Sequence, residues 1–208
     1  MRLLRGGPPR ETKRRLDYEL IQDLVPEGCR VLDLGCGDGE LLEALCERKQ
    51  CQGYGIEIND YLVTQCLRRG VAVYHGDMLE GIGHFRDGAF DVVVLSQTLQ
   101  QSADPLRVVR EMLRVGSRAI ISFPNFGYWR TRLQLLIGGR MPRHDLLPYT
   151  WYNTPNVHLC TVADFRDLCH DEGLVRVTEV FLTPPDRRIG DFLANWRAGL
   201  AIFEVCRA

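Results

Sequence analysis

The sequence predicts an α/β fold in which a mostly parallel sheet carries helices on both faces. Three observations lead to this prediction. A short apolar run, 31–34, is followed by a glycine-rich turn and an amphipathic segment, which is the order strand, turn and helix. Apolar runs and amphipathic segments then alternate along the chain to residue 123. The run 90–95 is apolar except for Asp91, as expected for a central parallel strand.

Length and composition favour one globular domain. The chain has 208 residues, of which 45% are hydrophobic and 25% charged, so it can bury one full core. We expect a flexible basic N-terminal tail over 1–13 and a single domain over 14–208 with an insertion at 124–160. A net charge of −1 gives no general attraction to nucleic acid. No segment resembles a secretory leader or a membrane span, so we expect a cytoplasmic protein without a membrane or nucleic-acid partner.

The eight cysteines of the chain do not form a metal or disulfide pattern. None belongs to a C-x-x-C pair, and no Cys/His spacing suits zinc. Most lie among apolar neighbours in predicted strands or helices. We therefore expect no metal site and free, buried thiols in a reducing compartment.

A helix over 15–25, ended by Pro26, precedes the first strand and the glycine turn. A dinucleotide fingerprint G-x-G-x-x-G would require glycine at position 40, where this chain has Glu40. Carboxylates around the turn would repel a pyrophosphate but suit a ligand with a sulfonium and an ammonium group. The pattern D-x-G-x-G-x-G resembles the nucleotide motif of class I S-adenosylmethionine-dependent methyltransferases. The predicted cofactor-binding residues here are Asp33, Gly35, Cys36, Gly37, Asp38 and Gly39.

Acidic residues follow the second and third predicted strands. Glu57 ends the strand 53–57, and we assign it and Ile58 to the cofactor site. A carboxylate at this point can accept both ribose hydroxyls, although Glu57 could instead face solvent. After the strand 71–75, Asp77 resembles the adenine-reading position of those methyltransferases, with Met78 covering the ring. Alternatively, Asp77 caps the next helix.

The loop after the strand 90–95 should face the reacting methyl group, because ligands bind beyond the carboxyl ends of parallel strands. We assign Ser96 and Gln97 to the cofactor site. The rest of the loop also offers glutamines, which cannot take a proton at neutral pH. We therefore assign no catalytic residue, and whether the chain is an enzyme stays open.

A helix over 105–115 and a strand over 119–123 precede the insertion, which is unusually long for a link between a strand and a helix. Residues 128–137 have helical spacing, with Trp129, Leu133, Leu136 and Ile137 on one face. Aromatic residues and arginines dominate binding interfaces, so we interpret the insertion as a partner surface. The alternatives are a lid whose aromatic residues pack on the domain itself and a lid over a substrate. His158 is either a general base or a loop anchor. The residues assigned to this role are Trp129, Arg130, Trp151, Tyr152 and His158.

The C-terminal part predicts one helix and two strands. Thr161 and Asp164 match a capping box that opens a helix ending at Gly173. Strands are expected over 175–182 and 200–206, joined by a long mobile connection around 184–188.

Four segments together resemble one family of bacterial methionine-biosynthesis proteins, MetW. They are 30–40, 96–100, 123–126 and the W-Y-N-T-P-N-x-H run at 151–158, and the similarity extends from about 14 to 205. The resemblance implies a Rossmann-like class I methyltransferase fold with seven strands and an antiparallel last strand. It also implies S-adenosylmethionine or S-adenosylhomocysteine as cofactor and homoserine O-acyltransferase as partner.

The expected function is therefore an S-adenosylmethionine-binding, methyltransferase-like protein of methionine biosynthesis. It would associate with homoserine O-acyltransferase, an acetyl- or succinyltransferase, as a hetero-oligomer and support or regulate it. The alternative is a catalytically active small-molecule methyltransferase, since positioning alone can drive methyl transfer to a nucleophilic acceptor. A nicotinamide-dependent oxidoreductase is disfavoured by Glu40 and the acidic turn.

Overall fold

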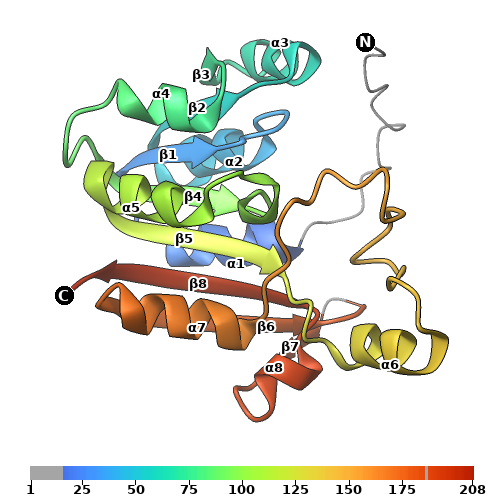
Figure 1. Ribbon diagram of the computed structural model, residues 1–208. Helices are drawn as coiled ribbons and strands as arrows, with labels where there is room; N and C mark the ends of the chain where they lie inside the picture. Colours follow the sequence, from blue (N-terminus) through green and yellow to red (C-terminus); the bar gives the residue numbers. More distant parts are fainter. Residues whose placement is uncertain (1–15, 186) are drawn as a thin grey trace.

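A mixed sheet organises the residues that the computed structural model describes, 16–185 and 187–208 (Figure 1). The predicted tail 1–13 lies outside the described residues. The strand order is β3-β2-β1-β4-β5-β8-β6-β7. The strands are β1 (Arg30–Leu34), β2 (Gln52–Glu57), β3 (Ala72–His75), β4 (Phe90–Ser96), β5 (Gly116–Pro124), β6 (Leu174–Thr183), β7 (Arg187–Ile189) and β8 (Leu200–Arg207).

Strands β1 to β5 are parallel, as predicted, and β8 lies antiparallel between β5 and β6. The predicted number of seven strands is wrong, because the described residues form eight. The additional strand β7 pairs antiparallel with the end of β6, where the sequence predicted a mobile connection. This three-residue edge strand contains two arginines, so its apolar alternation is too short to identify from sequence.

Helices cover both faces of the sheet. On one face α4, α5 and α7 pack over a core that contains Phe123 and Phe203. On the other face α1, α2 and α3 pack over a second core that contains Ile21 and Leu42. Figure 1 shows α5 and α7 in front of the sheet and α1 and α2 behind it. The helices are α1 (Leu16–Leu24), α2 (Glu40–Lys49), α3 (Asp60–Arg68), α4 (Met78–Gly83), the 3₁₀ turn η1 (Leu99–Gln101), α5 (Pro105–Val115), α6 (Trp129–Gly138), α7 (Val162–Asp171) and α8 (Ala194–Arg197).

Local capping explains where α3 and α7 begin. The Asn59 side chain accepts hydrogen bonds from the amides of Tyr61 and Leu62 at the start of α3. The predicted capping box of Thr161 and Asp164 is confirmed at the start of α7. On α3 the side chain of Cys66 is buried, whereas that of the neighbouring apolar residue Leu67 is 62% exposed. The reason is that α3 packs mainly on β2 and the edge strand β3, which offer little surface to cover a second row of side chains.

The order of the strands reverses between β1 and β4, which pair directly with each other. The chain runs from β1 outward through β2 to β3, and from β4 outward through β5. The loops after β1 and β4 therefore leave the sheet in opposite directions, and in open α/β sheets a ligand-binding crevice is expected at the carboxyl ends of such strands. In the described part of the chain, no helix combines the length and the apolar character needed to cross a bilayer.

Candidate functional site

The glycine turn after β1 has a backbone that favours glycine at three alternate positions. Gly35, Gly37 and Gly39 have φ angles of +69°, +61° and +82°. A Cβ added to Gly35 would lie 3.0 Å from the Thr98 Oγ1 atom, so the turn also approaches the loop after β4 closely. A Cβ added to Gly37 would meet no heavy atom within 4 Å. The backbone at Gly37 is therefore open to a ligand.

Glu57 holds its carboxylate at the tip of β2 by three backbone hydrogen bonds. Its Oε2 accepts from the amide of Gly37 at 3.0 Å, and its Oε1 accepts from the amides of Ile58 at 2.9 Å and Asn59 at 2.8 Å. The interpretation that Glu57 faces solvent is wrong, because the residue is only 7% exposed. The carboxylate joins the glycine turn to the start of α3.

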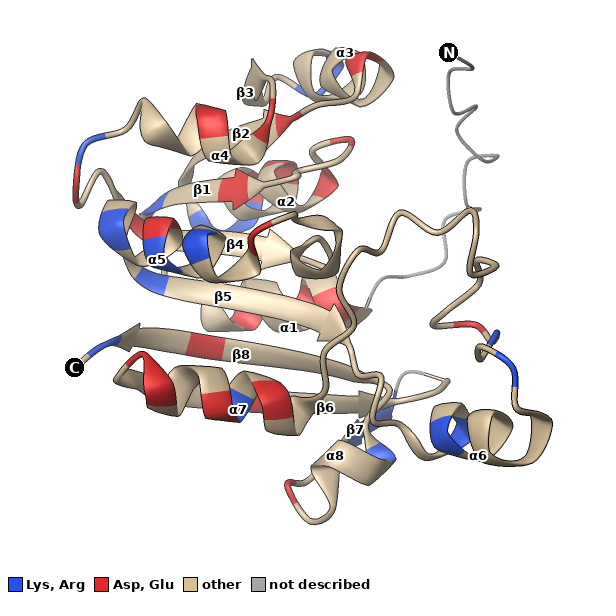
Figure 2. Cartoon of the chain, in the orientation of Figure 1, with Lys and Arg blue, Asp and Glu red and all other residues tan. Residues whose placement is uncertain are grey.

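Figure 2 shows further acidic residues around the glycine turn, and their surroundings differ. Asp33 is buried near the end of β1. Asp38 forms an ion pair with Arg69, whose Nη2 lies 3.0 Å from its Oδ2. Arg69 also pairs with Glu43 of α2. One of the predicted negative charges is thus compensated by an arginine, which sequence reasoning did not identify.

Cys36 points its side chain into the core and away from the crevice. Its Sγ would lie 2.4 Å from a Cβ added to Gly55, so the glycine in β2 makes room for it. The Sγ of Cys66 in α3 lies 3.8 Å away. Burial raises the pKa of both thiols. Both are therefore protonated at neutral pH and poor nucleophiles, and only the backbone of Cys36 faces the turn.

The residues after β2 and β3 form the outer part of the site. The side chain of Ile58 is exposed, and Met78 packs partly against the core. Asp77 caps α4, because its Oδ1 accepts from the amides of Leu79 at 2.8 Å and Glu80 at 3.3 Å. The capping role considered for Asp77 is thus present, and its adenine-reading role stays a prediction.

The loop after β4 is held by α1 and β5. Gln97 has a φ angle of +52°, which is uncommon for a residue with a side chain. Its amide donates to the Ser122 carbonyl oxygen at 2.9 Å, and its Nε2 donates to the Asp17 Oδ2 at 2.6 Å. The Ser96 and Ser122 hydroxyls lie 3.3 Å apart. Sequence reasoning missed Asp17, because no local signal marks a contact across 80 residues.

Gln100 connects this loop to the insertion. Its backbone oxygen accepts from the amides of Val157 at 2.8 Å and His158 at 3.0 Å. Its Nε2 donates to the Gln97 carbonyl oxygen at 2.7 Å. Gln100 is 7% exposed, and among the described residues its buried Oε1 has no hydrogen-bond donor.

We expect Gln100→Leu to change the free energy of unfolding by no more than about 1 kcal/mol. The variant loses the bond to the Gln97 carbonyl but also removes a buried acceptor without a donor, and these effects oppose each other. Urea denaturation of the variant and the wild type measures the difference. A loss of several kcal/mol would show that the Oε1 atom has a partner in solution.

The base of the insertion is closed by buried hydrogen bonds. The amide of Phe126 donates to the Cys160 carbonyl oxygen at 3.0 Å. Asn125 is buried, and its Nδ2 donates to the Ala198 carbonyl oxygen at 2.7 Å. Its Oδ1 accepts from the amides of Gly127 at 3.0 Å and Val162 at 3.1 Å. Asn125 therefore fixes the start of the insertion to the start of α7 and the end of α8.

The residues assigned to the insertion's function do not converge on the glycine turn. Trp129 and Arg130 lie exposed at the start of α6. Trp151 and Tyr152 are exposed and contact each other edge to face, with ring centroids 5.6 Å apart. The Nε2 of His158 lies 3.3 Å from the Ala103 carbonyl oxygen. This contact and the amide bond to Gln100 match the loop-anchoring alternative for His158.

The neutral side chain of His144 connects α6 to the bend that follows it by two hydrogen bonds. The amide of Leu146 donates to Nδ1 at 3.3 Å, so Nε2 carries the proton and donates to the Thr131 hydroxyl at 2.9 Å. Burial, followed by the charge of Arg130, lowers the pKa of His144 from 6.5. The folded chain therefore binds this proton less tightly than the unfolded chain.

We expect α6 to open more readily in acid. The contribution of neutral His144 to stability is fully present above pH 6.5 and is lost as the pH falls below that value. Amide hydrogen exchange of α6 at about pH 7.5 and about pH 5.5, corrected for intrinsic rates, measures the effect. The His144→Gln variant, which cannot titrate, is the control. Equal opening free energies at both pH values in the wild type would contradict this expectation.

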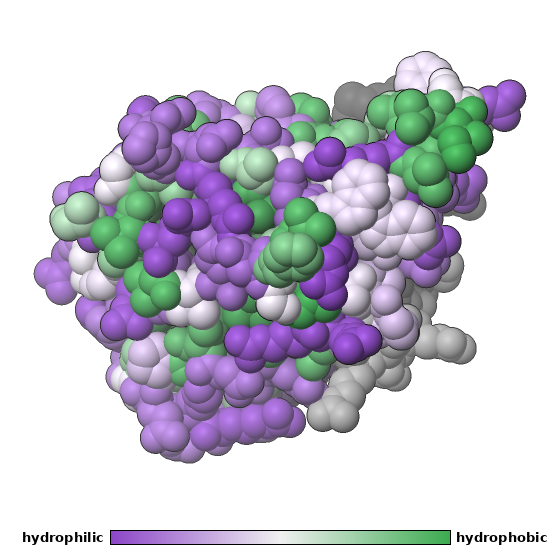
Figure 3. Space-filling model, turned by 90° about the horizontal axis from the view of Figure 1, so that it is seen from below, coloured by the Kyte–Doolittle hydropathy of each residue, from purple (hydrophilic) through white to green (hydrophobic). Residues whose placement is uncertain are grey.

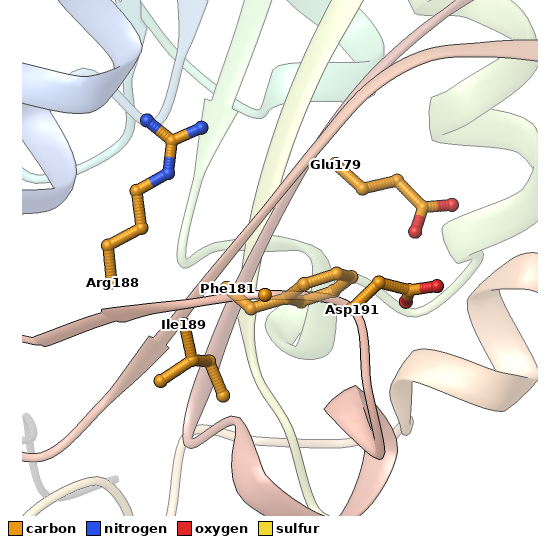
Figure 4. Close-up of a pocket in the computed structure, with 6 residues that line it drawn as sticks. Glu179, Phe181, Arg188, Ile189 and Asp191 are labelled. Carbon is orange, nitrogen blue, oxygen red and sulfur yellow. The ribbon is translucent and has the colours of Figure 1, made fainter.

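A separate open hollow of about 550 Å³ lies at the antiparallel edge of the sheet (Figure 4). Glu179 of β6 and Asp191 point their carboxylates toward the same region, with the Phe181 ring beside them and Arg188 on the other side of the strand. Both carboxylates form ion pairs with Arg166. The cluster is thus an ion-pair network that joins α7 to β6 and to the loop after β7. Within the described ranges, no group of three or more His, Cys, Asp or Glu side chains could hold a metal ion.

Sequence comparison identifies similar proteins. The model of the family described as methionine biosynthesis protein MetW matches residues 15–205. The bifunctional methionine biosynthesis protein MetXA/MetW of Rhodopirellula baltica is 38% identical over 182 residues, which are 83% of this chain and 29% of that protein. A ubiquinone biosynthesis O-methyltransferase of Xanthomonas campestris is 34% identical over 119 residues, 53% of this chain and 49% of that enzyme. The chain thus spans less than half the length of these curated relatives.

Structure comparison identifies the fold. An S-adenosylmethionine-dependent methyltransferase from Mesorhizobium loti matches with a TM-score of 0.68 at 17% identity, covering 93% of this chain and 99% of that one. A second S-adenosylmethionine-dependent methyltransferase, from Thermotoga maritima, gives a TM-score of 0.66 at 16% identity and covers 92% of this chain and 87% of that one. These matches establish a Rossmann-like methyltransferase fold.

Proposed function

Because the chain belongs to the MetW family of methionine biosynthesis proteins, we propose that it binds S-adenosylmethionine and acts with homoserine O-acyltransferase. The demethylated product, S-adenosylhomocysteine, would bind at the same place. The role of the chain is to support or regulate the acyltransferase, which adds an acetyl or succinyl group to homoserine.

The buried carboxylate of Glu57 beside the open glycine turn is the observation that carries the cofactor proposal. The residues at the crevice fit the ligand. Glu57 would accept the ribose hydroxyls, and Asp77 would accept from adenine with the oxygen that does not cap α4. Asp33 is buried beside the turn, and an ionised carboxylate at this position favours a cationic ligand. When bound, S-adenosylmethionine supplies an activated methyl group on a sulfonium.

The fused relative supports the partner proposal. The name of the Rhodopirellula baltica protein combines MetXA and MetW in one bifunctional polypeptide. Fusion of two proteins in one polypeptide raises the effective concentration of each near the other. It therefore favours association of proteins that act together. We propose that this chain makes the corresponding association with a homoserine O-acyltransferase.

The chemistry of the crevice favours an accessory role over catalysis. Gln97 and Gln100 line the loop after β4, and neither side chain can accept a proton at neutral pH. Burial keeps the thiols of Cys36 and Cys66 protonated by raising their pKa values. The ring of His158 lies against the Ala103 carbonyl oxygen.

Ligand binding could regulate the complex, because S-adenosylmethionine is made from methionine and its occupancy would report pathway output. Regulation requires the ligand to favour one conformation of the complex by differential affinity. The contacts of Gln97 with Asp17, and of Gln100 with the end of the insertion, connect the crevice to the outer part of the molecule.

An acyltransferase assay tests the proposal. Purified homoserine O-acyltransferase from the same genome is assayed with and without this chain, over a range of S-adenosylmethionine concentrations. We expect the two proteins to co-elute in size-exclusion chromatography and the activity to depend on this chain. Unchanged activity together with no co-elution would exclude the acyltransferase as partner.

Similarity to ubiquinone biosynthesis O-methyltransferases favours a second candidate, an active small-molecule methyltransferase. In this case the insertion would cover a substrate. Transfer of labelled methyl from S-adenosylmethionine to a metabolite extract, and its loss in Glu57→Ala, would support this candidate. Absence of labelled product with the wild type would count against it.

A further inference from the structure

The apolar stripe of α6 faces away from the rest of the molecule. Leu133, Leu136 and Ile137 share one side of the helix with Trp129, and Leu136 and Ile137 are 83% and 77% exposed. The buried position of α6 is instead Thr131, which bonds to His144. An apolar helix stripe left in water is unfavourable and is typical of a binding surface.

α8 and the loop before it extend this apolar surface. The guanidinium of Arg132 in α6 lies 5.4 Å from the centroid of the Trp196 ring in α8. A Cβ added to Gly127 would lie 2.6 Å from the Asn195 Oδ1, so the two segments pack closely. Figure 3 shows hydrophobic and aromatic residues gathered over this side of the molecule. We call this surface the α6–α8 face, and its exposed apolar residues are Leu133, Leu136, Ile137, Phe192, Leu193 and Trp196.

Positive charge predominates on the α6 side of the α6–α8 face. The segment 126–144 contains four arginines and no Asp or Glu. Figure 2 shows basic residues on α6 and in the loop that follows it and one basic segment on α8, together with acidic segments in the loop after α6 and the loop before α8. Arginine and tryptophan are enriched at protein interfaces, where lysine and acidic residues are depleted. The complementary surface would have an apolar centre and an acidic rim.

From these observations we infer that the α6–α8 face is the docking surface for the acyltransferase, which presents an apolar patch edged by Asp and Glu. This inference rests on the proposed function. The face is held in place before binding by the buried bonds of Asn125 and by the bond between Thr131 and His144. Little conformational entropy is therefore lost when a partner docks.

Two other occupants fit less well. A second copy of this chain related by two-fold symmetry would bring the arginines of one α6–α8 face against those of the other, and this repulsion would weaken the dimer. A basic amphipathic helix can bind anionic lipid, but a relative whose name combines MetXA and MetW in one polypeptide favours a protein partner.

Binding of purified variants to the acyltransferase tests the surface. In titration calorimetry with the complete chains, we expect Leu136→Glu to weaken binding at least about tenfold, because it places a charge in the apolar centre. Leu67→Glu is the matched control, since Leu67 is 62% exposed on α3, away from this face, and we expect less than about a twofold change.

Charge reversal tests the acidic rim of the partner. We expect Arg130→Glu combined with Arg140→Glu to slow association at low salt by about tenfold or more. The control is Arg68→Glu combined with Arg86→Glu, which changes net charge equally at exposed positions of α3 and the loop after α4. Affinity for S-adenosylhomocysteine should be unchanged in all four variants, which shows that they are folded.

The outcomes distinguish the two proposals. If the wild type does not bind the acyltransferase, the proposed function fails and the docking surface fails with it. If the wild type binds and Leu136→Glu binds equally well, only the docking surface is overturned. It is also overturned if Leu136→Glu keeps acyltransferase binding but abolishes binding to phosphatidylglycerol vesicles, or converts a dimer into a monomer.

Discussion

Glu57→Ala should weaken binding of S-adenosylhomocysteine by about a hundredfold or more. In the proposed binding mode the wild-type carboxylate accepts two hydroxyl hydrogen bonds from the ribose, and bonds to a charged acceptor each contribute about 1.5–3 kcal/mol. Losing both corresponds to at least about two decades in the dissociation constant. Titration calorimetry at about pH 7 measures the affinity.

Controls separate binding from folding in this experiment. The carboxylate also holds the amides of Gly37, Ile58 and Asn59, so Glu57→Ala could loosen the turn itself. Glu57→Gln keeps an acceptor of nearly the same shape and should give an intermediate affinity. Glu40→Gln removes one negative charge from the same turn and should change the affinity by much less. Wild-type affinity in Glu57→Ala would contradict the assigned role.

Asn125→Ala should lower the free energy of unfolding by about 3 kcal/mol or more. Truncation leaves the carbonyls of Asn195 and Ala198 and the amides of Gly127 and Val162 without this side chain as partner. Each buried group that loses its hydrogen bond costs about 1–3 kcal/mol, and the costs are not strictly additive. Urea denaturation followed by circular dichroism measures the change.

Asn125→Asp tests the hydrogen bonds of this side chain more specifically than Asn125→Ala does. It has almost the same shape, but an oxygen replaces the Nδ2 donor and faces the carbonyls of Ala198 and Asn195. We expect it to be at least as destabilising as alanine near neutral pH and to recover partly in acid, where a protonated carboxyl can donate. Gln100→Leu, with its small expected change, is the buried-amide control. A loss below about 1 kcal/mol in Asn125→Ala would show that the contacts are replaced by water.

The parts of the fold that were predicted correctly depend on signals within a few residues. The succession of strands and helices along the chain up to residue 123 followed from the spacing of apolar runs. The capping box of Thr161 and Asp164 was predicted because both partners lie within one helical turn. The glycine turn was identified because alternate glycines allow the positive φ angles that the structure shows.

Features that depend on distant neighbours could not be predicted. The spacing of Leu133, Leu136 and Ile137 indicated a shared helix face, but burial depends on what packs against it, and here that face is exposed. The hydrogen bond between Asp17 and Gln97 and the buried contacts of Asn125 join segments far apart in the chain. β7 was missed because its pairing depends on β6.

The sequence by itself determined that this chain has a parallel α/β core with a glycine turn and an acid at the tip of the second strand. These features arise from backbone preferences and from side-chain periodicity, which are local. Only the tertiary structure decided that Glu57 is buried against the turn, that Asp17 holds Gln97, and that α6 turns its apolar stripe outward. Burial and long-range hydrogen bonds depend on which surfaces meet when the whole chain folds, and a linear pattern does not contain that information.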